Sequence, residues 1–299
     1  MPGTELPALP GVLWQARQSA FAVGEFIGQE SFVTATEVRD LARAAGISPG
    51  ISVLDLCCGT GGPGRLLVRE LGCGYLGVDA SPSSIAVART LAAPPSPAAR
   101  AEPSAPPRYR VACVPPLPAG SWEVVVLLET LLAFSERRSL VASIAAALPL
   151  GGRFAFTVEE GAPLTPEERL RMPAADTVWL TDLSQLLADL AAVGLEVRWQ
   201  VETSRSHGET AAALAEAYAH ARRRTGDRDA TGTLSGLVRS HRLWADWLAS
   251  GRVRKFALVT EKVGSAGAPS SPGAHRPAGS RTSGPAGTRC LRPVRKARL

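Results

Sequence analysis

The segment that most constrains this chain is a glycine-rich turn near residue 60. Residues 52–56 form a short apolar run, residues 57–64 read CCGTGGPG, and residues 65–71 have the pattern of a helix. Glycines in such a turn let the backbone bend sharply and let a ligand approach without a Cβ in the way. The sequence therefore predicts a strand–turn–helix unit that holds a ligand at the carboxyl end of its strand.

The rest of the chain alternates short apolar runs with helical segments. Strands are expected at residues 52–56, 75–79, 109–114, 122–128, 153–158, 195–201 and 253–260, and helices at residues 65–71, 82–92 and 135–148. Helix-terminus signals support these boundaries: Gly72 as a C-cap, Ser81 as an N-cap followed by Pro82, and Thr181 as the N-cap of a further helix. Strands separated by helices form right-handed crossovers. We expect an α/β, Rossmann-like fold, with a seven-stranded, mostly parallel sheet and helices on both faces.

Two helical regions lie outside this alternation. Residues 12–45 have a helical pattern that breaks near Gly24 and Gly28, which predicts an N-terminal helical cap over residues 1–46. A helical insert at about residues 205–250 precedes the last strand, and the main domain covers residues 47–263. An apolar stripe at helical spacing runs along the insert through Leu234, Leu237, Val238, His241, Trp244 and Leu248. Core packing accounts for this stripe and for His241, whereas Tyr218, Trp244 and Trp247 also suit a lid over an acceptor.

Two segments have low complexity. Residues 94–107 contain six prolines, which prevent helix and ladder formation and predict a long extended loop. Residues 264–299 are rich in Gly, Ser, Pro and Arg and are expected to be disordered. This tail carries seven Arg or Lys residues and no acid, while the formal net charge of the whole chain is +6. The remaining chain is nearly neutral, so nucleic acid is an expected partner only through the tail.

Several classes of protein are excluded by what the sequence lacks. No run of 18 or more apolar residues exists, so no transmembrane helix and no membrane partner is expected. The N-terminus has no basic region followed by an apolar stretch, which argues against a secretory signal. The five cysteines form no C-x-x-C pair, which argues against a zinc ribbon or a disulfide scaffold. We expect a cytoplasmic protein without a bound metal.

Two acidic residues define the ligand that the glycine turn would hold. Gly59, Gly61 and Gly64 spell G-x-G-x-x-G, and Asp79 follows Gly59 by twenty residues, at the end of the next strand. A carboxylate there can accept hydrogen bonds from ribose hydroxyls, although it could instead cap the next helix. Asp55 would repel a pyrophosphate but suits a ligand that carries an ammonium and a sulfonium. Asp55 could also bond the backbone amides of the turn.

Four segments of the sequence resemble motifs of a known superfamily. VLDLCCGTGGPG at residues 53–64 and GYLGVDAS at residues 74–81 resemble the first two motifs of class I S-adenosylmethionine-dependent methyltransferases. LPAGSWEVVVLLET at residues 117–130 and LPLGGRFAFTVEEG at residues 148–161 are similar to their fourth and fifth strands. The resemblance covers residues 24–263 and is greatest for small-molecule types, such as sarcosine, dimethylglycine and quinone-precursor methyltransferases.

The resemblance implies a set of cofactor contacts for S-adenosyl-L-methionine. Asp55, Cys57, Gly59 and Gly61 would line the methionine end, and Asp79 would hold the ribose. Ala80, Ser81 and Cys113 would lie near the adenine, Leu128 and Glu129 would lie beside the cofactor, and Gln29 would close over it. The chain has Ala112-Cys113 where many members have Gly-Asp at the end of the third strand, so a backbone group would have to contact the adenine amino group.

Methyl transfer from a sulfonium needs little from the protein beyond orientation, because the donor is already activated. A base is needed only if the nucleophile carries a proton. Candidates on loops that follow strands are Glu129, Glu159, Glu160 and His207. The acceptor is expected to be a small molecule methylated at N, O or C, and the sequence does not define an oligomeric state. An NAD(P)-dependent oxidoreductase and a non-catalytic nucleoside-binding protein remain alternatives.

Overall fold

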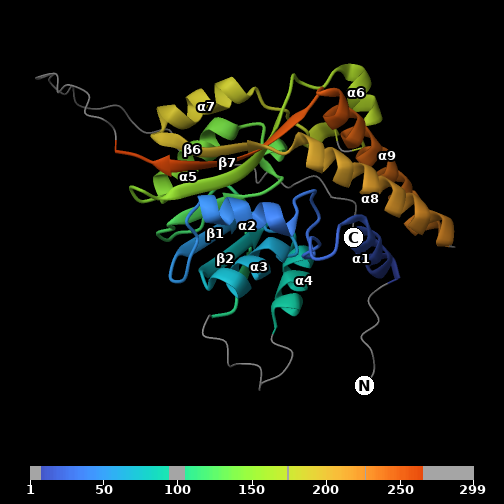
Figure 1. Cartoon of the computed structure of the whole chain (residues 1–299), viewed down its shortest axis with the longest axis horizontal. Helices are drawn as coiled ribbons and strands as arrows, with labels where there is room; N and C mark the ends of the chain where they lie inside the picture. Colours follow the sequence, from blue (N-terminus) through green and yellow to red (C-terminus); the bar gives the residue numbers. More distant parts are fainter. Residues whose placement is uncertain (1–7, 94–104, 174, 226, 265–299) are drawn as a thin grey trace, which may run out of the picture.

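The computed structural model describes residues 8–93, 105–173, 175–225 and 227–264. At its centre is a seven-stranded sheet in the order β3-β2-β1-β4-β5-β7-β6 (Figure 1). The strands are β1 (Ser52–Leu56), β2 (Gly74–Asp79), β3 (Arg108–Val111), β4 (Val124–Leu127), β5 (Arg153–Glu160), β6 (Leu195–Glu202) and β7 (Arg254–Lys262). The expected fold class and all seven strands are confirmed.

The strands from β1 to β5 pair in parallel, whereas β7 runs antiparallel to both β5 and β6. The right-handed crossover expected before the last strand is therefore wrong. Its physical reason lies in the helical insert, which consists of α8 (Ser204–Arg224) and α9 (Arg228–Ser250). The two helices form a hairpin that leaves from the C-terminal end of β6 and returns at the same end of the sheet. β7 therefore begins beside the end of β6 and runs antiparallel to it (Figure 1).

Helices cover both faces of the sheet, as expected. One face packs against α2 (Ala35–Ala44), α3 (Gly62–Leu71) and α4 (Pro82–Ala92) through a buried apolar cluster that includes Val38, Leu67 and Ile85. The opposite face packs against α5 (Arg137–Ala147) and α7 (Leu183–Ala192) through a second cluster, which includes Ile144 and Leu186. Each helix buries one apolar stripe, which is the pattern that a two-sided α/β sheet requires.

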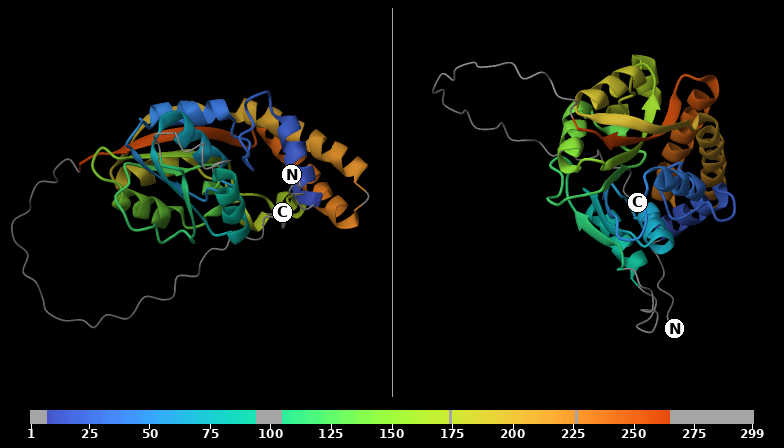
Figure 2. Two further views of the ribbon diagram at one scale, coloured as in Figure 1. Left: turned by 90° about the horizontal axis from the view of Figure 1, so that it is seen from below. Right: turned by 60° about the vertical axis from the view of Figure 1, so that its left-hand side comes forward.

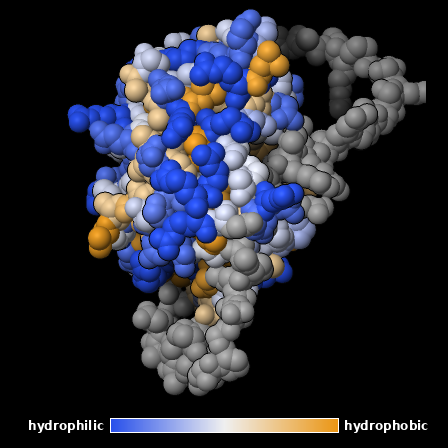
Figure 3. Space-filling model, turned by 90° about the vertical axis from the view of Figure 1, so that its right-hand side faces the viewer, coloured by the Kyte–Doolittle hydropathy of each residue, from blue (hydrophilic) through white to orange (hydrophobic). Residues whose placement is uncertain are grey.

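A third apolar cluster lies beyond the sheet and joins distant parts of the chain. It contains α1 (Ala8–Ala20), α8 and α9, together with the segment that holds α6 (Pro166–Arg171) and the short 3-10 helix η3 (Ala175–Thr177). Figure 2 shows α1 alongside α8 and α9 at one end of the molecule. Figure 3 shows that this end is mainly hydrophilic at its surface, with small hydrophobic areas between. This layer of α1, α8 and α9 lies beyond one end of the strands.

The structure tests several local predictions. The break expected near Gly24 and Gly28 within residues 12–45 is confirmed: α1 and α2 are separate helices, and the two glycines between them adopt positive φ angles of 84° and 87°. Asp182 and not Thr181 caps α7, since its side chain accepts a hydrogen bond from the amide of Gln185 at 2.9 Å. The caps at Gly72 and Ser81 are confirmed.

Some predictions concern residues that the structure does not describe. Most of the proline-rich segment at residues 94–107, the basic tail from residue 265 onward and the first seven residues lie outside the described ranges. Within the described part of the chain, no helix is long and apolar enough to cross a membrane. A short 3-10 helix, η2 (Leu131–Ala133), follows β4 and leads into the functional region.

Candidate active site

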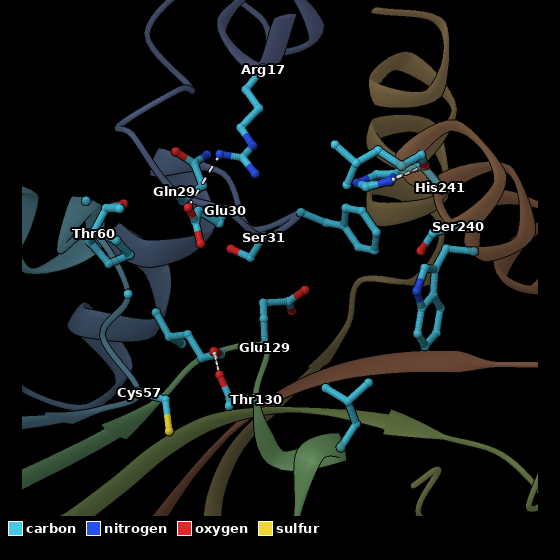
Figure 4. A pocket seen from close by; sticks show the side chains of 18 of the residues that line it. Arg17, Gln29, Glu30, Ser31, Cys57, Thr60, Glu129, Thr130, Ser240 and His241 are labelled. Atoms are coloured by element: carbon cyan, nitrogen blue, oxygen red, sulfur yellow. Dashed lines mark hydrogen bonds and ion pairs between the residues drawn. The ribbon is translucent and has the colours of Figure 1, made fainter. Parts of the chain in front are cut away.

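A cavity of about 480 Å³ lies at the carboxyl ends of β1, β4 and β5, under the layer of α1 and α9 (Figure 4). The glycine turn and the loop after β4 form its floor, residues 29–32 form one wall, and α9 forms the opposite wall. On the α9 side the lining includes Gly232 and Gly236, which have no side chain, and the small residue Ser240, so space is left along this wall. The cavity is thus placed where open α/β sheets bind their ligands.

The glycines of the turn have different roles. Gly59 has a φ of 55° and nothing within 4 Å of the position a Cβ would take, and it lines the cavity. Gly61 and Gly64 instead face the protein: a Cβ on Gly61 would lie 2.6 Å from the ring of Tyr109, and one on Gly64 would overlap Tyr75. Gly59 is therefore open to a ligand, whereas Gly61 and Gly64 are required by two tyrosines behind the turn.

Asp55 lies on β1 with 3% of its surface exposed, and it lines the cavity. The hydroxyl of Tyr75 donates a hydrogen bond of 2.5 Å to its Oδ2 atom. Burial raises the pKa of Asp55 to about 7, and the nearby charge of Asp79 adds to this, while the bond from Tyr75 opposes it. The observed partner of Asp55 is thus a side chain of the neighbouring strand, and no bond to the amides of the turn was found within the described structure.

Asp79 connects the turns that follow β1 and β2. Its carboxylate accepts hydrogen bonds from the amide of Gly59 at 3.0 Å and from the amide of Ser81 at 2.8 Å. Each carboxylate oxygen has a second lone pair available for a further donor. Ala80, Ser81 and Cys113 do not line the main cavity, and Cys113 is disulfide-bonded. Their expected contacts with a nucleoside stay predictions.

Four ionisable side chains meet at the cavity floor, among them three of the four candidates expected from the sequence. Lys255 of β7 forms ion pairs with Glu129 and, at 2.9 Å, with Glu159. The Nδ1 atom of His207 lies 3.7 Å from Glu129 Oε1, and its Nε2 atom is 3.0 Å from Glu37 Oε2. Glu129, Glu159 and Lys255 line the cavity. The fourth candidate, Glu160, instead pairs with Arg254 at 3.1 Å and is not among the lining residues.

Burial and Lys255 together set the charges of this cluster. Burial opposes the ionisation of Glu129, but the positive charge of Lys255 and the proximity of His207 lower its pKa. Burial raises the pKa of Glu159, against the effect of Lys255. For Glu37, the hydrogen bond and charge of His207 outweigh burial and lower the pKa to about 2. Lys255 and His207 therefore favour the ionised forms of Glu129 and Glu37, whereas burial favours the protonated form of Glu159 against the attraction of Lys255.

Aromatic side chains form the wall above this cluster. The ring of Phe32 packs edge-on against His241 and Trp244, with centroid distances of 5.6 and 6.4 Å, and Lys255 Nζ lies 5.0 Å from it. His241 bonds Leu237 O at 2.8 Å, and burial lowers its pKa to about 4, so it is a neutral wall residue. Of the aromatic residues expected in a lid, Trp244 lines the cavity, whereas Tyr218 and Trp247 are buried in the third apolar cluster.

Gln29 holds the segment that closes the cavity. Its side chain accepts from the amide of Ile27 at 2.7 Å and donates to the carbonyls of Glu25 and Val33. It is 3% exposed and lines the cavity, so it fixes the backbone between α1 and α2. A contact from Gln29 to a cofactor stays a prediction.

Sequence reasoning did not identify Lys255, Glu37 or Phe32 as site residues. The signal for Lys255 was present, because a lysine inside an otherwise apolar strand needs a buried partner. Glu37 occupies the third position of a capping box with Thr34, which explained it without a site. Phe32 lies between two helices and belongs to no periodic pattern. Cys57 and Leu128, which the sequence did identify, both line the cavity.

Comparison with known proteins identifies the family. Residues 31–200 match a family described as a methyltransferase domain, and the chain belongs to that family. The resemblance to class I S-adenosylmethionine-dependent methyltransferases inferred from the sequence is therefore confirmed.

Individual relatives are distant. A sterol 24-C-methyltransferase of Saccharomyces cerevisiae is 38% identical over 73 residues, which are 24% of this chain and 19% of that protein. The chain thus aligns with about a fifth of the length of this curated relative.

Solved structures share the fold at low identity. A Haemonchus contortus phosphoethanolamine N-methyltransferase, solved with S-adenosylhomocysteine, has a TM-score of 0.67 at 19% identity, covering 86% of this chain and 58% of that one. A cyclopropane synthase from Mycobacterium tuberculosis has a TM-score of 0.61 at 16% identity, covering 87% and 100%. A [4+2]-cyclase has a TM-score of 0.63 at 20% identity, covering 86% and 93%. Because one of these is a cyclase, the fold alone does not define the reaction.

Proposed function

We propose that this protein transfers a methyl group from S-adenosyl-L-methionine to a small-molecule acceptor. The observation that carries the proposal is the open face of Gly59 beside Asp55, at the floor of the main cavity. A ligand can approach the backbone at Gly59, and an acid rather than a phosphate-binding group faces it. Membership of a methyltransferase family supports the same reaction.

The residues present fit such a cofactor. Asp55, Cys57 and Gly59 would hold the methionine end, with the carboxylate of Asp55 near its ammonium group. Asp79 would accept from the ribose hydroxyls while it keeps its bonds to Gly59 and Ser81. A smaller cavity of about 120 Å³ extends between α1 and the start of α4 and offers further room on that side. When bound, the cofactor supplies an activated methyl group on sulfur.

The acceptor would occupy the rest of the main cavity. Its floor is acidic at Glu129 and Glu159, and its walls are aromatic at Phe32 and Trp244. The chain would align the acceptor atom with the sulfur–methyl bond and exclude water, which is most of what such a transfer needs. The shape of the cavity therefore favours a small or medium-sized acceptor with one polar end.

Thermal shift assays with separate ligands test the cofactor. S-adenosylhomocysteine is expected to stabilise the protein and NAD is not, because Asp55 would repel a pyrophosphate. Stabilisation by NAD alone would favour an oxidoreductase instead. Binding of S-adenosylhomocysteine without transfer of labelled methyl to any member of a broad acceptor screen would favour a non-catalytic nucleoside-binding protein.

Two further predictions from the sequence concern the location of the protein and a second partner. The cytoplasmic location stays a prediction, and so does binding of nucleic acid through residues 264–299. Salt-dependent retention on DNA or RNA that disappears when these residues are deleted is the expected sign of such binding.

A further inference from the structure

Three buried polar atoms of the ionisable cluster at the cavity floor lack a hydrogen-bond partner within the described structure: Oε1 of Glu129, Oε2 of Glu159 and Nδ1 of His207. Oε1 of Glu129 and Nδ1 of His207 lie 3.7 Å apart. The other oxygen of Glu129 is held by Lys255. Glu129 lines the cavity and its side chain rises from the floor (Figure 4), while its unpaired oxygen is buried on the side of His207. Buried polar atoms of this kind normally have partners, so the pair indicates a functional role.

The other side of His207 leads away from the cavity. Its Nε2 atom lies 3.0 Å from Oε2 of Glu37 on α2, and the hydroxyl of Ser206 donates to Oε1 of Glu37 at 2.8 Å. The His207 side chain is 1% exposed, whereas that of Glu37 is 19% exposed. The three side chains come from the loop after β4, from α8 and from α2, and together they connect the cavity floor to the protein surface.

We propose that Glu129 is the catalytic base, that His207 and Glu37 are positioning residues of a proton relay behind it, and that the acceptor is a nucleophile with an N–H or O–H group. This inference rests on the proposed function. The lone pair of the acceptor N or O forms the new bond to the methyl carbon, while the sulfur–methyl bond breaks and its electrons remain on sulfur. The acceptor proton passes to Oε1 of Glu129 and then to Nδ1 of His207. The proton on Nε2 passes to Glu37 and from there to water.

The charges around His207 suit this direction of transfer. The ionisable groups that face it come from four elements: Glu37 of α2, Glu129 after β4, Glu159 of β5 and Lys255 of β7. The carboxylate of Glu129 faces the Nδ1 side of the His207 ring, and that of Glu37 faces the Nε2 side. Lys255 limits the charge of the cluster and occupies one oxygen of Glu129, so only the oxygen that faces His207 can receive the proton.

The test measures methyl transfer to acceptors with and without a transferable proton. Benzylamine, N-methylbenzylamine and catechol carry N–H or O–H groups, and dimethyl sulfide carries none. For the best N–H or O–H acceptor at pH 7, His207→Asn is expected to lower kcat by about 100-fold or more, the usual contribution of proton transfer, with little change in KM. Glu37→Gln is expected to lower kcat about tenfold, because an amide can still accept from Nε2 but carries no charge.

The pH profile separates a relay from a structural defect. The loss in His207→Asn is expected to shrink as the pH rises toward 10, since the acceptor then loses its proton to the solvent. His220→Asn, the same substitution at an exposed position of α8, is expected to keep the wild-type profile. If His207→Asn does not fold, Glu37→Gln gives the same test, because its capping role in α2 is retained.

Three results would overturn the relay. They are a pH profile of the variants that matches the wild type, transfer confined to dimethyl sulfide, and no transfer to any N–H or O–H acceptor by protein that binds S-adenosylhomocysteine. Calorimetry of S-adenosylhomocysteine binding is done in parallel, because a protein that does not bind it contradicts the proposed function itself and not the relay alone.

Discussion

Asp55 is a single residue whose protonation state is coupled to the neighbouring strand. Its carboxyl is buried with a raised pKa of about 7, and Tyr75 donates to it. A docked ammonium group would favour the carboxylate. We therefore predict that S-adenosylhomocysteine affinity increases about tenfold from pH 6 to pH 8, with release of a proton below pH 7. Calorimetry in two buffers of different ionisation enthalpy measures both quantities.

Removal of the Tyr75 hydroxyl tests the same coupling. Because that hydroxyl favours the ionised carboxyl, Tyr75→Phe is expected to move the midpoint of the pH dependence upward. Tyr109→Phe is the matched control, since the Tyr109 hydroxyl donates to Gly61 O at 3.1 Å and not to Asp55. An affinity that stays constant between pH 6 and pH 8 in the wild type would contradict the prediction.

Asp79 is expected to contribute to cofactor affinity in two ways. Asp79→Ala removes the acceptors for ribose and also the bonds to the amides of Gly59 and Ser81. We predict at least about tenfold weaker binding of S-adenosylhomocysteine by calorimetry. Asp182→Ala, which removes a helix N-cap on α7, is the control and is expected to lower stability without changing this affinity. Unchanged affinity of Asp79→Ala would contradict the ribose assignment.

Lys255 is expected to be essential for stability because it neutralises a buried acidic pair. Lys255→Met leaves Glu129 and Glu159 close together without a cation, which should cost about 3–5 kcal/mol in the free energy of unfolding. In this variant both carboxyls have folded pKa values above their unfolded values. The loss should therefore be small below pH 4 and grow as the pH rises toward neutrality.

Denaturant unfolding at several pH values measures the effect of Lys255→Met. Lys262→Met, on the same strand, is the control: within the described structure the Lys262 ammonium donates to the carbonyl of Leu148 and forms no ion pair with a carboxylate. It is expected to cost about 1 kcal/mol with little pH dependence. An equal cost for the two variants at pH 7 would contradict the role of Lys255.

At the scale of elements, the sequence predicted the strand–turn–helix unit well. The bounds of β1 and α4 match the expected residues, because apolar runs and caps are local signals. The direction of β7 was not predictable in the same way. It depends on how the long helices α8 and α9 pack against each other. Their amphipathic pattern does not predict at which end of the sheet the chain re-enters it.

The α9 wall of the cavity offers a prediction at this scale. Nothing lies within 4 Å of a Cβ placed on Gly236, and the residue lines the cavity. Gly236→Leu is expected to fill acceptor space, lowering kcat/KM for the acceptor at least about tenfold while leaving S-adenosylhomocysteine affinity unchanged. Gly236→Ala improves helix propensity in the same way but adds one methyl, so it serves as the control. Equal kcat/KM for the two variants would place the acceptor elsewhere.

At the scale of the whole molecule, the cavity is closed by segments from opposite ends of the chain. Arg17 of α1 donates to the hydroxyl of Tyr218 on α8 at 3.0 Å and lies 3.5 Å from Glu30. These contacts join the N-terminal helix to the helical insert over the sheet (Figure 2). The cap and the insert, which are separate in sequence, thus form one layer.

This arrangement predicts global stabilisation by the cofactor product. S-adenosylhomocysteine at 100 times its Kd should raise the free energy of unfolding by about 2.7 kcal/mol. It should also slow chymotryptic cleavage within residues 21–34, which carry Gln29 and Phe32 into the cavity. NAD at the same concentration is the control. Cleavage of this segment at the same rate with and without S-adenosylhomocysteine would show that the layer does not close over the ligand.

The sequence by itself determined the class of fold, the glycine turn, the two acids at the ends of β1 and β2, and the family. These features are short-range: each depends on residues that are neighbours in the chain or repeat at a fixed period. Only the tertiary structure decided which charged groups meet. Glu37, Glu129, His207 and Lys255 are far apart in sequence and become partners because four elements converge on one buried point. There the low dielectric makes each group depend on the others, and no local pattern contains that information.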